Sequence, residues 1–342
     1  MVTRPLRLGL YGCGARTRTL LNNVKGVIDF EVAAAYDLID TSAREVADNY
    51  GGRVVETPEA LMSADDVDAF MVSLYPGAHG DVLVKLLPVG KPIYIEKPIA
   101  TTPEQAERVR RARAEHPDTL VHVGIMHRYV EVFRRVKQLT HAGRVGELVS
   151  VHANWVARMG DPEHFPGGIN NWHFHPETGG ELIQHQCHQF DWFRQLGGDI
   201  VAVTATTNQP HRKGLPVEDT INVSLEFASG VLASGHYSQN NPRNTIMGWI
   251  EGTGGSIEWE WGEPSRIDIY EYHPGQMHTD PVEHKEMDPG FDEAGRRGIV
   301  DFVKAVRGEI EPRVTIDDAL RSVEIGFAVR ESARTGRRVT LD

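Results

Sequence analysis

The chain has 342 residues, and its 36 Lys and Arg against 48 Asp and Glu give a formal net charge of −12 at pH 7. This acidic balance disfavours nucleic acid and anionic membrane surfaces as partners, because both carry negative charge. A chain of this length is expected to form about two domains. The cysteines, Cys13 and Cys187, are too few for a disulfide framework, and no apolar run reaches the length of a membrane span. We therefore expect a cytoplasmic protein.

Strand-like and helix-like patterns alternate along the first third of the chain. Short apolar runs at 6–11, 31–36, 69–73, 92–96 and 120–125 predict buried strands, and helix start and stop signals lie between them. Thr57-Pro58 and Thr102-Pro103, for example, each offer a capping side chain followed by a proline at the first helical position. The pattern predicts a parallel, doubly wound α/β sheet over residues 1–124.

The remainder, residues 125–342, is predicted to form an α+β domain. Residues 221–227 and 256–261 alternate with a period of two, which is typical of strands with one buried and one solvated face. Turn sequences at 228–230 and 252–255 predict an antiparallel meander. Helices are expected over 131–141, 180–196 and 316–335.

The segment Gly12-Cys13-Gly14-Ala15-Arg16-Thr17 follows a strand and opens a helix, which predicts a dinucleotide-binding loop. The glycines permit a tight turn, and the helix N-terminus favours a pyrophosphate. Thr17 replaces the third glycine of the usual pattern, and we expect it to hold the helix slightly further from the sheet. The alternative is a purely structural turn.

Asp37 ends the second predicted strand, where a carboxylate can accept hydrogen bonds from the adenosine ribose hydroxyls. It would repel a 2′-phosphate, so the sequence favours NAD over NADP as the cofactor. The alternative is that Asp37 only caps the following helix.

Further motifs resemble the Gfo/Idh/MocA oxidoreductase family. They are Glu96-Lys97-Pro98 with His79 upstream, the segment 178–182 leading to His188 and Asp191, and the segments 218–220 and 331–337. With the Gly12 loop and Asp37, they extend the resemblance over essentially the whole chain. The resemblance implies an N-terminal Rossmann domain, an open-faced, mostly antiparallel C-terminal sheet, assembly as a homodimer or homotetramer, and carbohydrate substrates.

The resemblance also implies that Lys97 and His188 bracket the hydroxyl that is oxidised, with Glu96, Lys97 and His79 near the cofactor. Lys97 follows a strand end, where ligands of doubly wound sheets bind, and a cationic nicotinamide would favour its neutral amine. The alternatives are an ion pair of Lys97 with Glu96 and a satisfied core histidine at position 188.

Gln184, His188 and Asp191 share one face of the predicted helix, where Asp191 could orient the His188 imidazole. The position of Gln184 is commonly acidic in the family. Because an amide cannot take up a proton, we expect the proton relay to rest on His188 and Lys97.

Aromatic, histidine and arginine side chains of the second domain are candidate substrate contacts, since ring faces and guanidinium groups suit a hydroxylated ligand, including an anionic one. Besides Lys97, Gln184 and His188, they are Arg128, Tyr129, Trp155, Arg158, Trp172, His173, His175 and His185. A zinc site at His185 and His188, completed by His175 or Cys187, is the weaker interpretation, and we predict no metal. The arginines within 108–113 are expected on a solvated helix face.

The leading functional hypothesis is an NAD-dependent dehydrogenase of a sugar, sugar acid or polyol. One alternative is a redox-neutral glycosidase that oxidises, eliminates, hydrates and reduces in turn, which Gln184 and the additional histidines would suit. Another is a catalytically silent ligand sensor on the same scaffold, which the presence of Lys97 and His188 disfavours.

Overall fold

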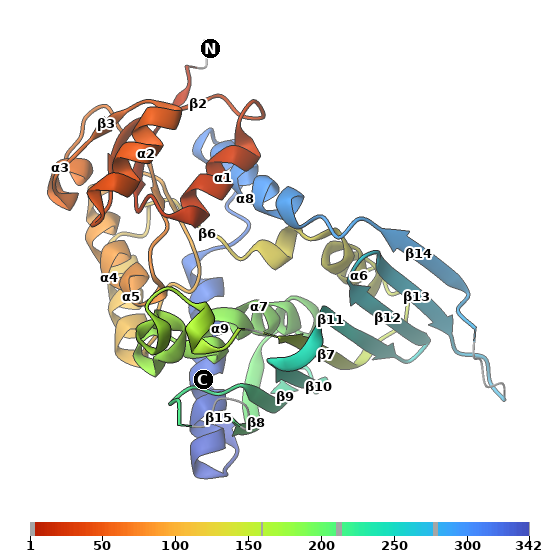
Figure 1. Cartoon of the computed structure of the whole chain (residues 1–342). Coiled ribbons are helices and arrows are strands. Elements are labelled where there is room, and N and C mark those ends of the chain that lie inside the picture. Colours follow the sequence, from red (N-terminus) through yellow and green to blue (C-terminus); the bar gives the residue numbers. More distant parts are fainter. Residues whose placement is uncertain (1–3, 159, 210–213, 276–279, 342) are drawn as a thin grey trace. The chain divides into compact units, whose positions relative to one another are not determined.

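The computed structural model describes residues 4–158, 160–209, 214–275 and 280–341. The chain divides into two compact units (Figure 1). The first comprises Met1–Met126 and Asp292–Leu320, and the second comprises His127–Phe291 and Arg321–Asp342. Within the described residues, no helix has the length and apolarity that crossing a membrane requires.

A six-stranded parallel sheet forms the centre of the first unit. The strands are β1 (Leu6–Tyr11), β2 (Phe30–Tyr36), β3 (Arg53–Val54), β4 (Ala69–Val72), β5 (Ile93–Ile95) and β6 (Val121–Val123), in the spatial order β3-β2-β1-β4-β5-β6. The order reverses between β1 and β4, and ligands of such sheets bind beyond the carboxyl ends of the strands at this point. The predicted doubly wound sheet is confirmed.

Five helices accompany these strands: α1 (Ala15–Val24), α2 (Asp40–Tyr50), α3 (Pro58–Met62), α4 (Pro76–Leu86) and α5 (Pro103–Glu115). The hydroxyls of Thr57 and Thr102 accept the backbone N–H groups of Ala60 and Gln105, so both predicted caps are confirmed. Arg108, Arg110 and Arg111 of α5 pair with acidic neighbours at the surface, for instance Arg108 with Asp81 at 2.5 Å, as expected of a solvated face. Arg113 differs from this expectation, because it is partly buried and donates to the backbone carbonyls of His116 and Thr119.

The division of the chain differs from the prediction of two continuous domains, 1–124 and 125–342. The chain returns to the first unit at Asp292, where α8 (Phe291–Val306) inserts Ile299, Phe302 and Val303 into the core beside the sheet. The apolar face of one helix does not identify the sheet that it covers, so sequence periodicity could not place α8.

The described residues of the second unit form a nine-stranded sheet with the order β14-β13-β12-β11-β7-β10-β9-β8-β15. Its strands are β7 (Leu148–Arg158), β8 (Ile200–Asn208), β9 (Thr220–Phe227), β10 (Leu232–Ser238), β11 (Asn240–Gly252), β12 (Gly255–Trp261), β13 (Ser265–Glu271), β14 (Glu283–Met287) and β15 (Val339–Thr340). All neighbours are antiparallel except β7 and β10, which are parallel. The mostly antiparallel sheet is confirmed, but the simple meander is wrong because β7 lies between β10 and β11.

Helices pack on one face of this sheet. Phe133 of α6 (Glu131–His141) contacts the rings of Trp259 and Trp261 in β12, and Gln189 of α7 (Gly180–Gly197) donates to the Ala153 carbonyl in β7. The third helix, α9 (Ile316–Thr335), bonds to β8 through Ser332. Alternate strand residues point to the opposite face, where Trp249 is 39% exposed and stacks on His152.

Candidate active site

The loop between β1 and α1 has a backbone that requires glycine. Gly12 has a φ of 92°, and a Cβ at this position would lie 2.1 Å from the Ser73 carbonyl oxygen. Around Gly14 the space is open, because a Cβ there would meet no heavy atom within 4 Å. Ala15, the first residue of α1, is exposed. The N-terminus of α1 is therefore accessible to a phosphate group.

Thr17, at the position of the third glycine, ties the first turn of α1 to this loop. Its hydroxyl is buried and donates to the Gly12 carbonyl at 2.8 Å. The neighbouring Cys13 is also buried, and burial raises the pKa of its thiol to about 12, so the thiol stays protonated at neutral pH.

Asp37 stands at the end of β2 and accepts hydrogen bonds from the backbone on both sides of it. The Cys13 N–H donates to Oδ2 at 2.7 Å and the Ile39 N–H donates to Oδ1 at 2.8 Å. Each carboxylate oxygen can accept a second hydrogen bond, so Asp37 can still receive two ribose hydroxyls. The residues of this unit thus fit a dinucleotide.

An ion pair joins the Gly12 loop to the strand end that carries Lys97. Arg16 donates from Nε and Nη2 to Glu96 Oε1 at 3.1 and 2.9 Å, and the Tyr94 hydroxyl donates to the same oxygen at 3.2 Å. A Cβ at Gly124 would lie 2.9 Å from that oxygen, so glycine leaves room for the network. The Glu96 side chain is 7% exposed, and Arg16 balances its charge.

His79 fixes the other side of the Lys97 segment. Leu74 N–H donates to His79 Nε2 at 3.0 Å, so the ring proton is on Nδ1, which donates to the Pro98 carbonyl at 3.0 Å. Burial lowers the pKa of His79 to about 4 and keeps the ring neutral at physiological pH. Both ring nitrogens thus bond to the protein, and the expectation that His79 lies near the cofactor stays a prediction. Lys97 itself follows β5 and is partly buried.

Ring contacts in the second unit connect many of the predicted substrate residues. Trp155 of β7 contacts His185 at 5.6 Å and His188 at 6.5 Å between ring centroids. His185 lies 6.4 Å from His173, and Trp172 stacks on His173 at 3.6 Å. The structure thus brings these five aromatic and imidazole rings into one cluster.

Sequence reasoning missed one member of this cluster, His127. Its ring stacks on His188 with centroids 4.2 Å apart and an interplanar angle of 17°, and it also contacts Trp155. Its position directly before Arg128-Tyr129, two predicted site residues, was the one available signal.

Arg128 and Asp191 form a buried, bidentate ion pair. Arg128 Nε donates to Oδ2 at 2.8 Å and Nη2 donates to Oδ1 at 2.6 Å. The side chains are 11% and 1% exposed. Both oxygens of Asp191 therefore accept from Arg128, whereas the sequence suggested that Asp191 orients His188.

The remaining predicted residues have different surroundings. Gln184 is buried, and its Nε2 donates to the Thr178 carbonyl at 3.5 Å. Tyr129 is buried, Arg158 is exposed near the end of β7, and His175 Nδ1 lies 3.4 Å from a carboxylate oxygen of Glu177.

Among the described residues, one trio has potential metal-ligand atoms within 4.8 Å of one another: Asp161, Glu163 and His164. These residues lie at and beside η3 (Pro162–His164), and Glu163 and His164 are exposed. Exposed acidic groups often cluster without a metal, so we assign this trio no role. The histidines considered for zinc do not form such a group within the described chain.

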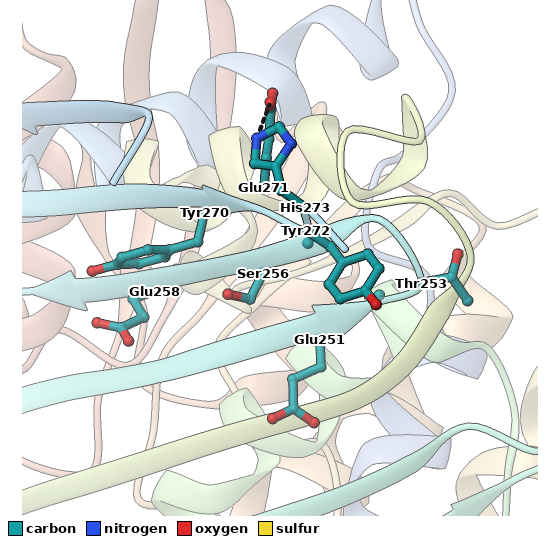
Figure 2. A pocket seen from close by; sticks show the side chains of 10 residues that line it. Glu251, Thr253, Ser256, Glu258, Tyr270, Glu271, Tyr272 and His273 are labelled. Atoms are coloured by element: carbon teal, nitrogen blue, oxygen red, sulfur yellow. Dashed lines mark ion pairs between the residues drawn. The ribbon is translucent and has the colours of Figure 1, made fainter. Parts of the chain in front are cut away.

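A hollow of about 590 Å³ lies at the end of β11, β12 and β13 in the second unit. Figure 2 shows Glu251, Ser256 and Tyr270 beside it, side chains that the strand register places on the open face of the sheet. Glu271 and His273 form an ion pair at its rim. None of the predicted site residues lines this hollow.

Comparison with known proteins establishes the family. Residues 6–125 match the family model described as the NAD-binding Rossmann fold of the oxidoreductase family, and residues 137–341 match its C-terminal alpha/beta domain. The chain belongs to the Gfo/Idh/MocA oxidoreductase family. The predicted NAD cofactor and Rossmann domain are thereby confirmed.

Some of the curated relatives match nearly the whole chain. Inositol 2-dehydrogenase 2 of Saccharopolyspora erythraea is 30% identical over 98% of this chain and 96% of its own length. The scyllo-inositol 2-dehydrogenase (NAD(+)) of Bacillus subtilis is 25% identical over 98% of this chain and 94% of its own. Among solved structures, levoglucosan dehydrogenase in complex with NADH and levoglucosan superposes with a TM-score of 0.87 at 20% identity, covering 99% of this chain and 100% of that chain.

Proposed function

We propose that this Gfo/Idh/MocA oxidoreductase oxidises a hydroxyl-bearing carbon of a sugar or polyol with NAD. The observation that carries the proposal is Lys97, which follows β5 in the NAD-binding unit and is held on either side by the Glu96–Arg16 pair and the His79–Pro98 bond. The named activities of the relatives support a polyol or sugar substrate.

Bound NAD supplies the acceptor for the hydride. Lys97 hydrogen-bonds the reacting oxygen, and His188 takes up the hydroxyl proton. Gln184 cannot exchange a proton, so it contributes a hydrogen bond only. Each of these roles is part of the proposal.

Aromatic rings of the second unit hold the substrate. Trp155, Trp172 and the neighbouring histidines offer ring faces, which suit the C–H faces of a sugar or cyclitol, and ring N–H groups, which suit its hydroxyls. Because Arg128 is engaged with Asp191, we favour a neutral polyol over an anionic sugar acid.

The test is a reaction series with purified protein, NAD and a panel of inositols, free sugars and aryl glycosides. NADH absorbance and released aglycone are followed in the same samples. NADH formation with a polyol or free sugar is the expected result. Aglycone release without NADH would replace the proposal by a redox-neutral glycosidase, and silence in both channels across the panel would count against a sugar dehydrogenase.

A Lys97→Ala variant tests the catalytic assignment. We expect it to lose turnover while NADH still binds, because the Gly12 loop and Asp37 are unchanged. The binding is measured by NADH fluorescence titration. Full turnover in this variant would remove Lys97 from the mechanism.

The open face of the nine-stranded sheet is the surface that we propose joins two copies of the chain in a homodimer or homotetramer. Leu232 is 56% and Trp249 39% exposed on it, an apolar exposure that association would cover. Light scattering should show the molar mass of a dimer or tetramer, and Trp249→Glu should reduce the molar mass of this assembly. A monomeric wild-type protein would contradict this proposal. We also propose a cytoplasmic location, which the presence of two buried cysteine thiols, Cys13 and Cys187, supports.

A further inference from the structure

We infer that His127 is a positioning residue for His188, holding the plane of its imidazole for proton transfer. The inference rests on the role proposed above for His188. His127 lies on η2 (Met126–Tyr129), and His188 lies in the middle of α7. Neither the motifs nor the helical periodicity of the sequence connects these two residues.

The geometry is a stack of three rings. His127 stacks on Phe133 of α6 with centroids 5.0 Å apart at 21°, and on His188 with centroids 4.2 Å apart at 17°. Because its plane is nearly parallel to both, His127 is the ring that connects Phe133 to His188 in the stack.

Aromatic side chains from the sheet enclose the stack. Trp261 meets His127 edge-on, with centroids 5.1 Å apart at 80°, and Trp155 is tilted against both imidazoles at 5.5 and 6.5 Å. His127 is 5% exposed and His188 is 3% exposed. A rotation of the His188 ring out of its plane would break the closest of these contacts, so the stack fixes the ring orientation.

The stack also affects the proton. When His188 takes up a proton, its imidazolium faces the π system of His127, which is a favourable interaction. A second proton on His127 would be repelled by the first. In the proposed mechanism, His188 is the ring that exchanges a proton with the substrate.

Other titratable groups lie on the elements that carry these rings. Arg128 on η2 and Asp191 on α7 neutralise each other in their ion pair. The rings of His185 and of Tyr237 in β10 both contact Trp155, with the Tyr237 and Trp155 centroids 6.0 Å apart. None of these side chains is altered in the variants below, so a change in pH dependence reports on position 127.

The experiment compares His127→Phe, which keeps a ring in the stack, with His127→Leu, which keeps apolar bulk but no ring. Steady-state kcat and KM are measured from pH 5 to 9, with NADH affinity by fluorescence and melting temperature as controls. We expect His127→Phe to keep kcat within about threefold of wild type, and His127→Leu to lose about tenfold or more in kcat with little change in KM. If His127→Leu does not fold, His127→Gln, a planar amide without a ring, replaces it.

The pH profile separates positioning from a merely structural role. Loss of the ring removes a cation–π contact, so the acidic limb of the kcat profile should move to lower pH by about 0.5 to 1 unit in His127→Leu and stay in place in His127→Phe. Wild-type kcat and pH profile in a folded His127→Leu, or equal losses in both variants, would overturn the inference. A fully active His188→Ala would instead show that the proposed role of His188 is wrong.

Discussion

His79 links the stability of the NAD-binding unit to pH. Burial lowers the pKa of this histidine from 6.5 to about 4, because the fully enclosed site disfavours the charged ring and the bond from Leu74 N–H to Nε2 requires the neutral form. The hydrogen bond from Nδ1 to the Pro98 carbonyl raises the pKa and offsets only part of this effect. The unfolded chain therefore binds a proton at a pH where the folded unit does not. Its contribution to stability is fully present above pH 6.5 and is lost as the pH falls from 6.5 towards 4.

The size of the effect follows from the shift. The difference of 2.5 between the pKa values 6.5 and 4 corresponds to about 3 kcal/mol of stability lost below pH 4. At pH 5 the loss is already about 2 kcal/mol. This is a large fraction of the free energy of unfolding of an ordinary domain.

The measurement is urea denaturation at pH 7.5, 6 and 5 for wild type, His79→Gln and His116→Gln. The amide of Gln can both accept from Leu74 N–H and donate to Pro98 without titrating. We expect the free energy of unfolding of His79→Gln to fall less with decreasing pH than that of wild type, by about 2 kcal/mol at pH 5. His116, a partly exposed histidine of the same unit, is the control. Equal pH slopes for wild type and His79→Gln would refute the reasoning.

Three further predictions concern the loop, the cofactor preference and the buried ion pair. Gly12→Ala should melt at a markedly lower temperature than wild type and fail to bind NADH, because its Cβ would lie 2.1 Å from the Ser73 carbonyl oxygen. Gly14→Ala, with open space around it, should keep the wild-type melting temperature. Equal melting temperatures of the two variants would contradict the steric argument. Asp37→Asn keeps an acceptor oxygen but removes the charge that repels a 2′-phosphate. Fluorescence titration should therefore show that the affinity for NADPH rises about tenfold relative to the affinity for NADH. An unchanged ratio of the two affinities would mean that another residue discriminates between the cofactors. Asp191→Asn should lower the free energy of unfolding, measured by urea denaturation, by about 3–5 kcal/mol, because it leaves the nearly buried Arg128 cation without its counter-charge. The double variant Arg128→Met/Asp191→Leu should recover part of that loss. An unchanged free energy of unfolding in Asp191→Asn would show that the ion pair is not desolvated as the structure has it.

Local patterns in the sequence were sufficient to predict the parallel sheet of the NAD-binding unit. A strand, a glycine-rich turn and a helix form within about twenty residues, so the turn at Gly12 and the strand end at Asp37 could be located from their neighbours alone. The same holds for the Thr57 and Thr102 caps and for the alternating strands of the second unit. These features depend on backbone conformation and side-chain periodicity, which adjacent residues determine.

Tertiary structure decided the features that join distant parts of the chain. The return of α8 to the first unit, the parallel pairing of β7 with β10, the Arg128–Asp191 pair and the stack of His127 on His188 each depend on which surfaces pack together. Periodicity shows that a residue points into a core, but it does not show which other residue it contacts in that core. Sequence alone thus established the family, the cofactor and the separate motifs, whereas the partners of Asp191 and His188 became visible only once the helices had packed on the sheet, because contact between distant residues is set by packing and strand register.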